Sequence, residues 1–86
     1  MSNNIFLNNL ILLILETKDK ELLEDLIKSI LTTKELEMIP IRLELIKRLL
    51  NGEHHHKIAK DLKIGVATVT RGSNELKRGH FKILQQ

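Results

Sequence analysis

Residues 58–71 read Ile58-Ala59-Lys60-Asp61-Leu62-Lys63-Ile64-Gly65-Val66-Ala67-Thr68-Val69-Thr70-Arg71. Two short helical patterns, at about residues 55–62 and 66–78, are separated here by residues 63–65. Two helices joined by a turn of three or four residues are typical of a helix-turn-helix. The turn position after the first helix is commonly glycine in this motif, and a left-handed backbone at Lys63 would cost about 1–2 kcal/mol. The stretch therefore predicts a helix-turn-helix with a strained Lys63.

The side chains of this stretch are distributed as a helix-turn-helix requires. Ala59 is small at the expected close crossing of the two helices. Apolar residues follow at the positions that would pack between the helices: Leu62, Ile64 and Val69. The second helix begins with small, hydroxyl and guanidinium side chains, which can reach base edges and phosphates: Ala67, Thr68, Thr70 and Arg71. An ordinary helical hairpin is the alternative, and the distribution of charge favours the DNA-binding motif over it.

The basic charge of the chain is concentrated around this stretch. The 86 residues carry a formal charge of +3. Residues 1–53 hold 7 Lys and Arg against 9 Asp and Glu, a net charge of −2, whereas residues 54–86 hold 7 against 2, a net charge of +5. Such a basic segment suits a polyanion such as nucleic acid. A solvated basic face, or one that binds an acidic protein, is the alternative.

The chain before this stretch predicts two amphipathic helices. Leucines and isoleucines follow one helical face across residues 19–31, with Asp19 as the N-cap. The sequence Thr32-Thr33-Lys34-Glu35 has the form of a capping box, and the helix that it opens would stop at Gly52. Pro40 falls inside this second helix, where it removes a backbone hydrogen bond. The helix is therefore expected either to kink or to break at Pro40.

The N-terminal segment is apolar around a whole helical circumference. Residues 10–15 read Leu-Ile-Leu-Leu-Ile-Leu, and a helix of this kind must be covered on every side. A bilayer span needs about 20 apolar residues, so no membrane partner is expected. An 86-residue chain has too little protein to cover the helix by itself. An intertwined homodimer is the economical prediction, because most soluble oligomers are symmetric.

Metal binding and catalysis are not expected. The chain has no cysteine, and the consecutive residues His54, His55 and His56 point about 100° apart on a helix, so they cannot converge on one ion. These histidines are expected instead on the solvent and phosphate side of the basic segment. Ser73 has no base to activate it, and no glycine-rich phosphate loop is present. The chain is therefore not predicted to be an enzyme.

The residues that follow the turn resemble a known family. Val66-Ala67-Thr68-Val69-Thr70-Arg71-Gly72-Ser73-Asn74 is similar to the recognition-helix signature of the bacterial tryptophan operon repressor family. Upstream, further residues match this family at the same spacing: Leu31-Thr32, Glu35, Arg42 and Leu49-Leu50-x-Gly52-Glu53. The resemblance extends over about residues 31–77.

The resemblance implies an all-α fold, an intertwined homodimer of about five to six helices per chain. It also implies L-tryptophan as a corepressor, its indole held between Arg42 and Arg71, and a guanidinium over an indole face is a favourable pair. Arg71 and Thr68 would bind the ligand carboxylate. The full set of residues that the resemblance places at the ligand is Leu31, Thr32, Arg42, Thr68, Arg71, Gly72 and Glu75, with Leu31 and Thr32 contributed by the partner subunit and Gly72 leaving room for the ring.

Two residues, Glu75 and Pro40, depart from the family pattern in ways that bear on the ligand. Glu75 stands where the family usually has a serine near the ligand's amino group, and a carboxylate there would either pair with the ammonium group or repel the ligand's carboxylate. Pro40 could shift Arg42 relative to Arg71. The alternative role of Arg42 is an ion pair with Glu35 or Glu44.

For DNA, the resemblance and the charge together indicate one set of residues. The resemblance implies that Val66, Ala67, Thr70 and Lys77 meet the groove or the DNA backbone and that Lys57 lies near phosphate. Arg71 is counted with them, and Lys60 and Lys63 are added because of their charge. The candidate DNA-binding residues are therefore Lys57, Lys60, Lys63, Val66, Ala67, Thr70, Arg71 and Lys77.

Together these features predict a cytoplasmic, sequence-specific repressor of transcription that acts on tryptophan-metabolism genes. The 86 residues would form a single domain, with a dimerisation core at 1–53, a helix-turn-helix reading head at 54–79 and a short tail at 80–86. Its partners would be double-stranded operator DNA, a second copy of the chain and L-tryptophan. The alternatives are a helix-turn-helix regulator that does not use tryptophan, and a helical interaction module that does not bind DNA.

Overall fold

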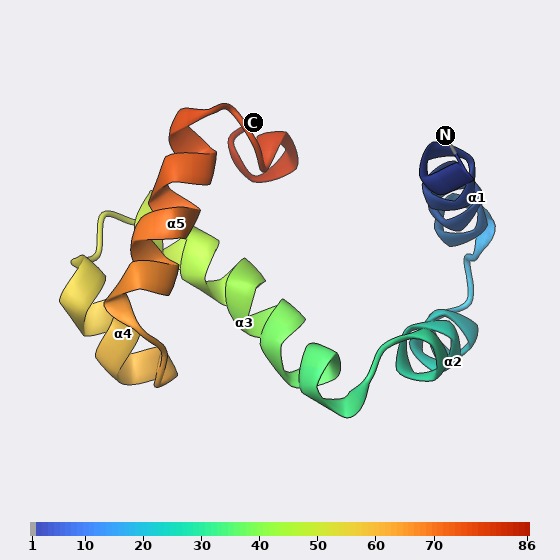
Figure 1. Cartoon of the computed structure of the whole chain (residues 1–86), viewed down its shortest axis with the longest axis horizontal. Helices are drawn as coiled ribbons and strands as arrows, with labels where there is room; N and C mark the ends of the chain where they lie inside the picture. The colour runs from blue at the N-terminus through green and yellow to red at the C-terminus, as the bar shows by residue number, and fades with distance from the viewer. Residues whose placement is uncertain (1) are drawn as a thin grey trace. The chain divides into compact units, whose positions relative to one another are not determined.

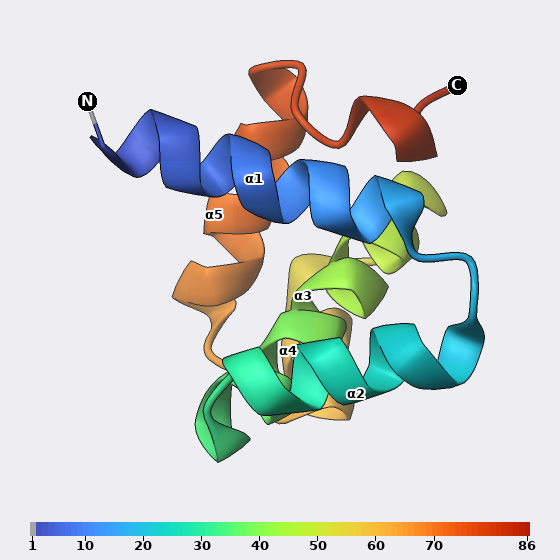
Figure 2. The same cartoon turned by 90° about the vertical axis from the view of Figure 1, so that its right-hand side faces the viewer.

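The computed structural model describes the backbone of residues 2–86 and the side chains of residues 4–86, and this part of the chain is all-helical (Figures 1 and 2). Its elements are α1 (Ser2–Glu16), α2 (Lys20–Ile30), α3 (Thr33–Leu50), α4 (His55–Leu62), α5 (Val66–Lys77) and the 3₁₀ turn η1 (Lys82–Leu84). The predicted all-α fold with five to six helices is confirmed. The chain divides into two compact units, residues 1–36 and residues 37–86.

The predicted helix caps are present in atomic detail. The Asp19 carboxylate accepts hydrogen bonds from the backbone N–H groups of Glu21 at 2.8 Å and Leu22 at 3.3 Å. The Thr32 N–H donates to Glu35 at 2.8 Å, and the Glu35 N–H donates to the Thr32 hydroxyl at 3.1 Å. These bonds satisfy backbone N–H groups that the first turn of a helix leaves unpaired, so the capping side chains fix where α2 and α3 begin.

Helix α3 continues through Pro40 and ends at a glycine. It runs unbroken from Thr33 to Leu50, so the alternative in which the helix breaks at Pro40 is wrong. After the last turn, the Glu53 N–H donates to the Arg48 carbonyl at 3.2 Å while Gly52 adopts φ +81°. A left-handed residue is needed for this closure, and glycine adopts that conformation without strain. The predicted stop at Gly52 is confirmed.

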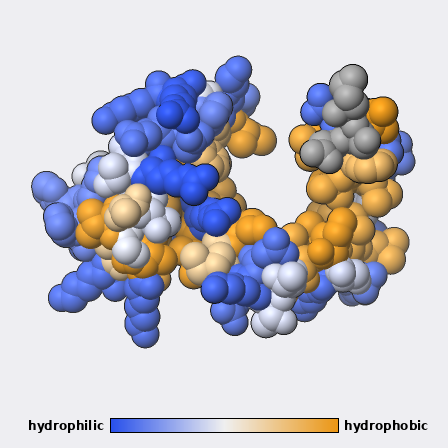
Figure 3. Space-filling view, viewed as in Figure 1, coloured by the Kyte–Doolittle hydropathy of each residue, from blue (hydrophilic) through white to orange (hydrophobic). Residues whose placement is uncertain are grey.

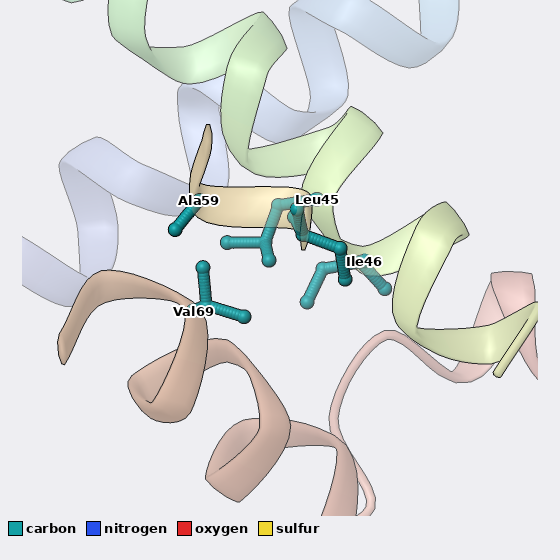
Figure 4. Close-up of a cluster of buried hydrophobic side chains, with 5 residues drawn as sticks. Leu45, Ile46, Ala59 and Val69 are labelled. Carbon is teal, nitrogen blue, oxygen red and sulfur yellow. The ribbon is translucent and has the colours of Figure 1, made fainter. Parts of the chain in front are cut away.

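Residues 37–86 enclose a small apolar core. Leu45 and Ile46 of α3 pack against Ile58 and Ala59 of α4 and Val69 of α5, and none of the five is more than 6% exposed (Figure 4). The expected packing of Ala59 and of Val69 is thereby confirmed. The other two residues expected between the helices, Leu62 and Ile64, are partly buried against this core.

The turn between α4 and α5 has the conformation that the sequence predicted. Lys63 is left-handed, with φ 56° and ψ 46°, and its N–H bonds to carbonyls of the last turn of α4. The Ile64 N–H reaches the Ala59 carbonyl at 3.0 Å. These bonds close α4 and turn the chain into α5, and they offset the backbone strain at a residue that is not glycine.

Residues 4–36 form no core of their own. No side chain in this range is buried, and α1 exposes large apolar residues around its circumference, among them Phe6 at 65% and Leu15 at 71%. Apolar surface on α1 is visible in the view of Figure 3. No helix within the described residues is long and apolar enough to cross a membrane. The apolar surface of α1 is therefore left uncovered within its own unit.

Replacement of Ile58 by alanine tests the core. Ile58 is fully buried, so the change removes apolar contacts and leaves a cavity, and we expect the free energy of unfolding to fall by about 2–4 kcal/mol. Urea denaturation at fixed protomer concentration measures this. Ile83→Ala is the matched control, because Ile83 is 78% exposed and its loss should change stability by less than about 0.5 kcal/mol. Equal effects of the two changes would contradict the assignment of the core.

Candidate ligand pocket and nucleic-acid interface

The candidate DNA-binding residues all lie on the surface. Lys57 and Lys60 are on α4, Lys63 is in the turn, and the others are on α5. Every one of them is exposed: Lys57, Lys60, Lys63, Val66, Ala67, Thr70, Arg71 and Lys77. The exposed set is therefore available to a large polyanion without rearrangement of the core.

A shallow hollow of about 500 Å³ runs along the outer face of α5. Its lining residues recur at helical spacing and are Val66, Ala67, Thr70, Arg71, Asn74, Glu75 and Arg78. Four of the candidate DNA-binding residues are thus brought together on one face, and Asn74 and Arg78 join them. We call this surface the outer face of α5.

Lys57 is exposed but already has carboxylate partners. Its ammonium group lies 2.9 Å from Asp61 and 3.7 Å from Glu53. Arg48, near the end of α3, reaches the same carboxylates at 2.8 Å and 3.5 Å and Glu44 at 3.3 Å. The hydrogen bonds from Lys57 and then Arg48 hold the pKa of Asp61 below its usual value. This charge network ties the end of α3 to α4, and its Lys57–Asp61 pair has the four-residue spacing typical of ion pairs on a helix.

A second hollow, of about 470 Å³, lies between α3, α5 and the segment that follows α5. Its lining comprises Met38, Arg42, Ile46, Thr68, Arg71, Gly72, Glu75, His80 and Phe81. The candidate ligand residues Arg42, Thr68, Arg71, Gly72 and Glu75 therefore share one pocket. Leu31 and Thr32 belong to the unit of residues 1–36 and are not among the residues that line it.

The guanidinium group of Arg42 is available to this pocket. None of the ion pairs found among the side chains of residues 4–86 involves Arg42. Its expected alternative partners are engaged elsewhere, since Glu35 caps α3 at Thr32 and Glu44 pairs with Arg48. Pro40 does not separate Arg42 from the arginine of α5, because both line the same pocket.

Gly72 permits α5 to lie close to α3. A Cβ atom at this position would come within 3.2 Å of Ile46 Cδ1 and within 3.2 Å of Leu45 Cδ2. Both neighbours are core side chains with little freedom to move, and a side chain at this position would have to displace them by a few tenths of an ångström. The close approach of the helices is a reason for glycine here that does not depend on a ligand.

The chain folds back after α5 and completes the pocket. Gly79 takes φ +86°, and the His80 N–H donates to the Glu75 carbonyl at 3.0 Å, which closes the helix and reverses the chain. Phe81 is then also left-handed, with φ 56°, a costly conformation for a bulky residue. His80 and Phe81 were not anticipated as pocket residues, although a glycine just after a helix signals such a reversal.

The Glu75 carboxylate shares the pocket with Arg42, Arg71 and His80. His80 Nδ1 contacts Glu75 Oε2, and an Arg78 guanidinium nitrogen lies 3.3 Å from Glu75 Oε1. The hydrogen bond with His80, aided by the charges of His80, Arg78 and Arg71, holds the pKa of Glu75 below its usual value. Glu75 is therefore ionised at neutral pH.

The three consecutive histidines lie at the start of α4. His54 precedes the helix, and His55 and His56 are in its first turn. His54 and His56 are exposed and His55 is half-buried. No group of three or more His, Cys, Asp or Glu side chains in the described residues is placed to hold a metal ion.

The fold and pocket define a class of protein: a small all-helical chain in which a basic two-helix segment packs on a longer helix beside a pocket with two arginines. Residues 6–85 match the family model described as Trp repressor protein, and the chain belongs to this family.

Relatives that carry the description "Trp operon repressor homolog" show the same relationship. The protein of Photobacterium profundum is 45% identical over 64 residues, which cover 73% of this chain and 58% of that protein. The protein of Vibrio campbellii is 39% identical over 66 residues, 76% of this chain and 66% of the relative. The protein of Vibrio parahaemolyticus is 39% identical over 66 residues, which cover 76% of this chain and 64% of that protein. The chain thus spans about three fifths to two thirds of the length of these relatives.

Acid should weaken the charge network around Asp61. Because the folded chain lowers the pKa of Asp61, this carboxylate contributes stability at neutral pH that is lost as the pH falls through the lowered pKa. We expect the free energy of unfolding to fall less between about pH 7 and about pH 3 in Asp61→Asn than in the unchanged chain. Asp25→Asn, at an exposed position outside the network, is the control. An unchanged pH slope in Asp61→Asn would contradict the role of the network.

Proposed function

We propose that this chain is a DNA-binding transcriptional repressor that acts as a homodimer, takes L-tryptophan as corepressor and regulates tryptophan-metabolism genes. The observation that carries the proposal is the position of α5. Its inner side lines the pocket with Arg42, and its outer face presents exposed candidate DNA-binding residues. One helix thus connects a site for a small molecule with a surface for a polyanion. Membership of the Trp repressor family supports both assignments.

The pocket has the chemistry that L-tryptophan needs. A planar guanidinium stacks well on an indole face, and Arg42 and Arg71 supply two such groups. Arg71 and the Thr68 hydroxyl would bind the ligand carboxylate. Met38, Ile46 and Phe81 add apolar surface for the ring. Leu31 and Thr32 would complete the site from the partner subunit.

The exposed residues of α4 and α5 favour binding that is dominated by phosphate contacts. The candidate set contains four lysines and one arginine, which gain affinity by releasing counterions from DNA. No Asn or Gln stands in residues 66–71 to read adenine with two hydrogen bonds. We therefore expect the affinity for DNA to fall steeply with salt.

Residues 4–36 are the reason to propose a dimer. Their helices bury no side chain, and α1 leaves apolar residues exposed around its whole circumference. Two copies of the chain can cover these surfaces for each other, and a symmetric dimer would also present two reading heads to two half-sites.

Oligomeric state tests the dimer directly. We expect sedimentation equilibrium to give twice the mass of one chain at micromolar concentration. Leu12→Glu places a charge on the apolar helix α1 and should raise the dissociation constant of the dimer at least tenfold. Ile83→Glu, at an exposed position outside α1, should leave the mass unchanged. A monomer in the unchanged chain would refute the proposed dimer.

Titration of fluorescent palindromic DNA tests the function. In the unchanged chain we expect binding that weakens between two salt concentrations and strengthens with L-tryptophan. Arg71→Ala should abolish the response to L-tryptophan because it removes a pocket residue. Lys77→Ala is the control, since Lys77 is exposed and outside the pocket lining: it should weaken DNA binding but keep the response.

The outcomes separate the candidate functions. No binding at low salt would contradict the repressor and favour an interaction module. A DNA affinity that does not change with L-tryptophan would favour a regulator without this corepressor. A normal response in Arg71→Ala would contradict the pocket assignment.

A further inference from the structure

Glu75 borders two surfaces with different proposed partners. It lines the pocket together with Arg42, and it lines the outer face of α5 together with Arg78. Arg71 is the other residue common to both linings. A charge at Glu75 therefore acts on a small molecule from one side and on a polyanion from the other.

The surroundings of Glu75 keep a negative charge at this place. His80 contacts one carboxylate oxygen, and Arg78 lies 3.3 Å from the other. Arg71 and, across the pocket, Arg42 are the remaining charged groups that line these two surfaces. The carboxylate side chain is 28% exposed, so its field is only partly screened by solvent.

We propose that Glu75 couples the ligand to DNA: in the free chain its carboxylate opposes the phosphate backbone, and the ammonium group of a bound amino acid neutralises it from the pocket side. This inference rests on the proposed function. It assigns Glu75 a role beyond holding the ligand, because the charge affects DNA binding even when no ligand is present.

The coupling must appear in both binding equilibria. If an ammonium group beside Glu75 raises the affinity for DNA by some factor, then DNA raises the affinity for the ligand by the same factor. Removal of the negative charge should therefore raise DNA affinity in the absence of ligand and reduce the further gain from the ligand. A residue that only holds the ligand would leave the ligand-free affinity for DNA unchanged.

Glu75→Gln tests the proposal in the full chain. We expect this variant to bind palindromic DNA about threefold to tenfold more tightly than the unchanged chain without ligand. Saturating L-tryptophan should bring both chains to a similar DNA affinity, so the enhancement by L-tryptophan is smaller in the variant. Glu75→Ser, a second uncharged variant, should behave alike, and circular dichroism verifies that each variant is folded.

Glu37→Gln is the matched control, because it removes the same charge from an exposed position that lines neither surface. It should leave the enhancement by L-tryptophan unchanged. Equal ligand-free affinity in the unchanged chain and in both Glu75 variants would overturn the coupling alone. Absence of DNA binding, or of any response to L-tryptophan, in the unchanged chain would overturn the proposed function and this inference together.

Discussion

The packing of Leu45 and Ile46 against α4 and α5 is the constraint on which residues 37–86 depend. These two side chains are the buried residues that α3 contributes to the core, and they meet Ile58, Ala59 and Val69. A unit of this size has little apolar area to bury, so a few well-packed side chains carry much of its stability. Ile46 also lines the pocket. The pocket is therefore an edge of the core, and its shape follows from how closely α5 approaches α3.

Much of this arrangement could be predicted because its signals are local. The caps at Asp19 and at Thr32, the stop at Gly52 and the left-handed Lys63 depend on hydrogen bonds between residues a few positions apart. Sequence spacing alone determines whether such bonds can form. Pro40 shows the limit of local rules, since α3 continues through a residue that disfavours helix interiors. The rest of the helix must outweigh that local cost.

The parts of the pocket that sequence did not indicate depend on contacts between distant segments. Met38 and Phe81 line the same hollow although more than 40 residues separate them. Their proximity requires both the core packing and the chain reversal at Gly79. The ion pair between Lys57 and Asp61 is different, because a spacing of four residues in the sequence already indicates such a pair on a helix. The resemblance suggested a phosphate contact for Lys57, and its carboxylate neighbour was the overlooked signal.

The two acidic residues among residues 54–86 are both placed against cations. Asp61 holds Lys57, and Glu75 holds Arg78. A net charge of +5 in this segment therefore overstates the positive groups free to meet DNA, because each paired cation must exchange a carboxylate for a phosphate. A cation that leaves a carboxylate for a phosphate gains little net energy, so the non-specific attraction of the surface for DNA is weaker than the charge of +5 suggests. At Glu75, a ligand ammonium group that pairs with the carboxylate from the pocket side would increase the effective positive charge of the outer face of α5 without any movement of the helices.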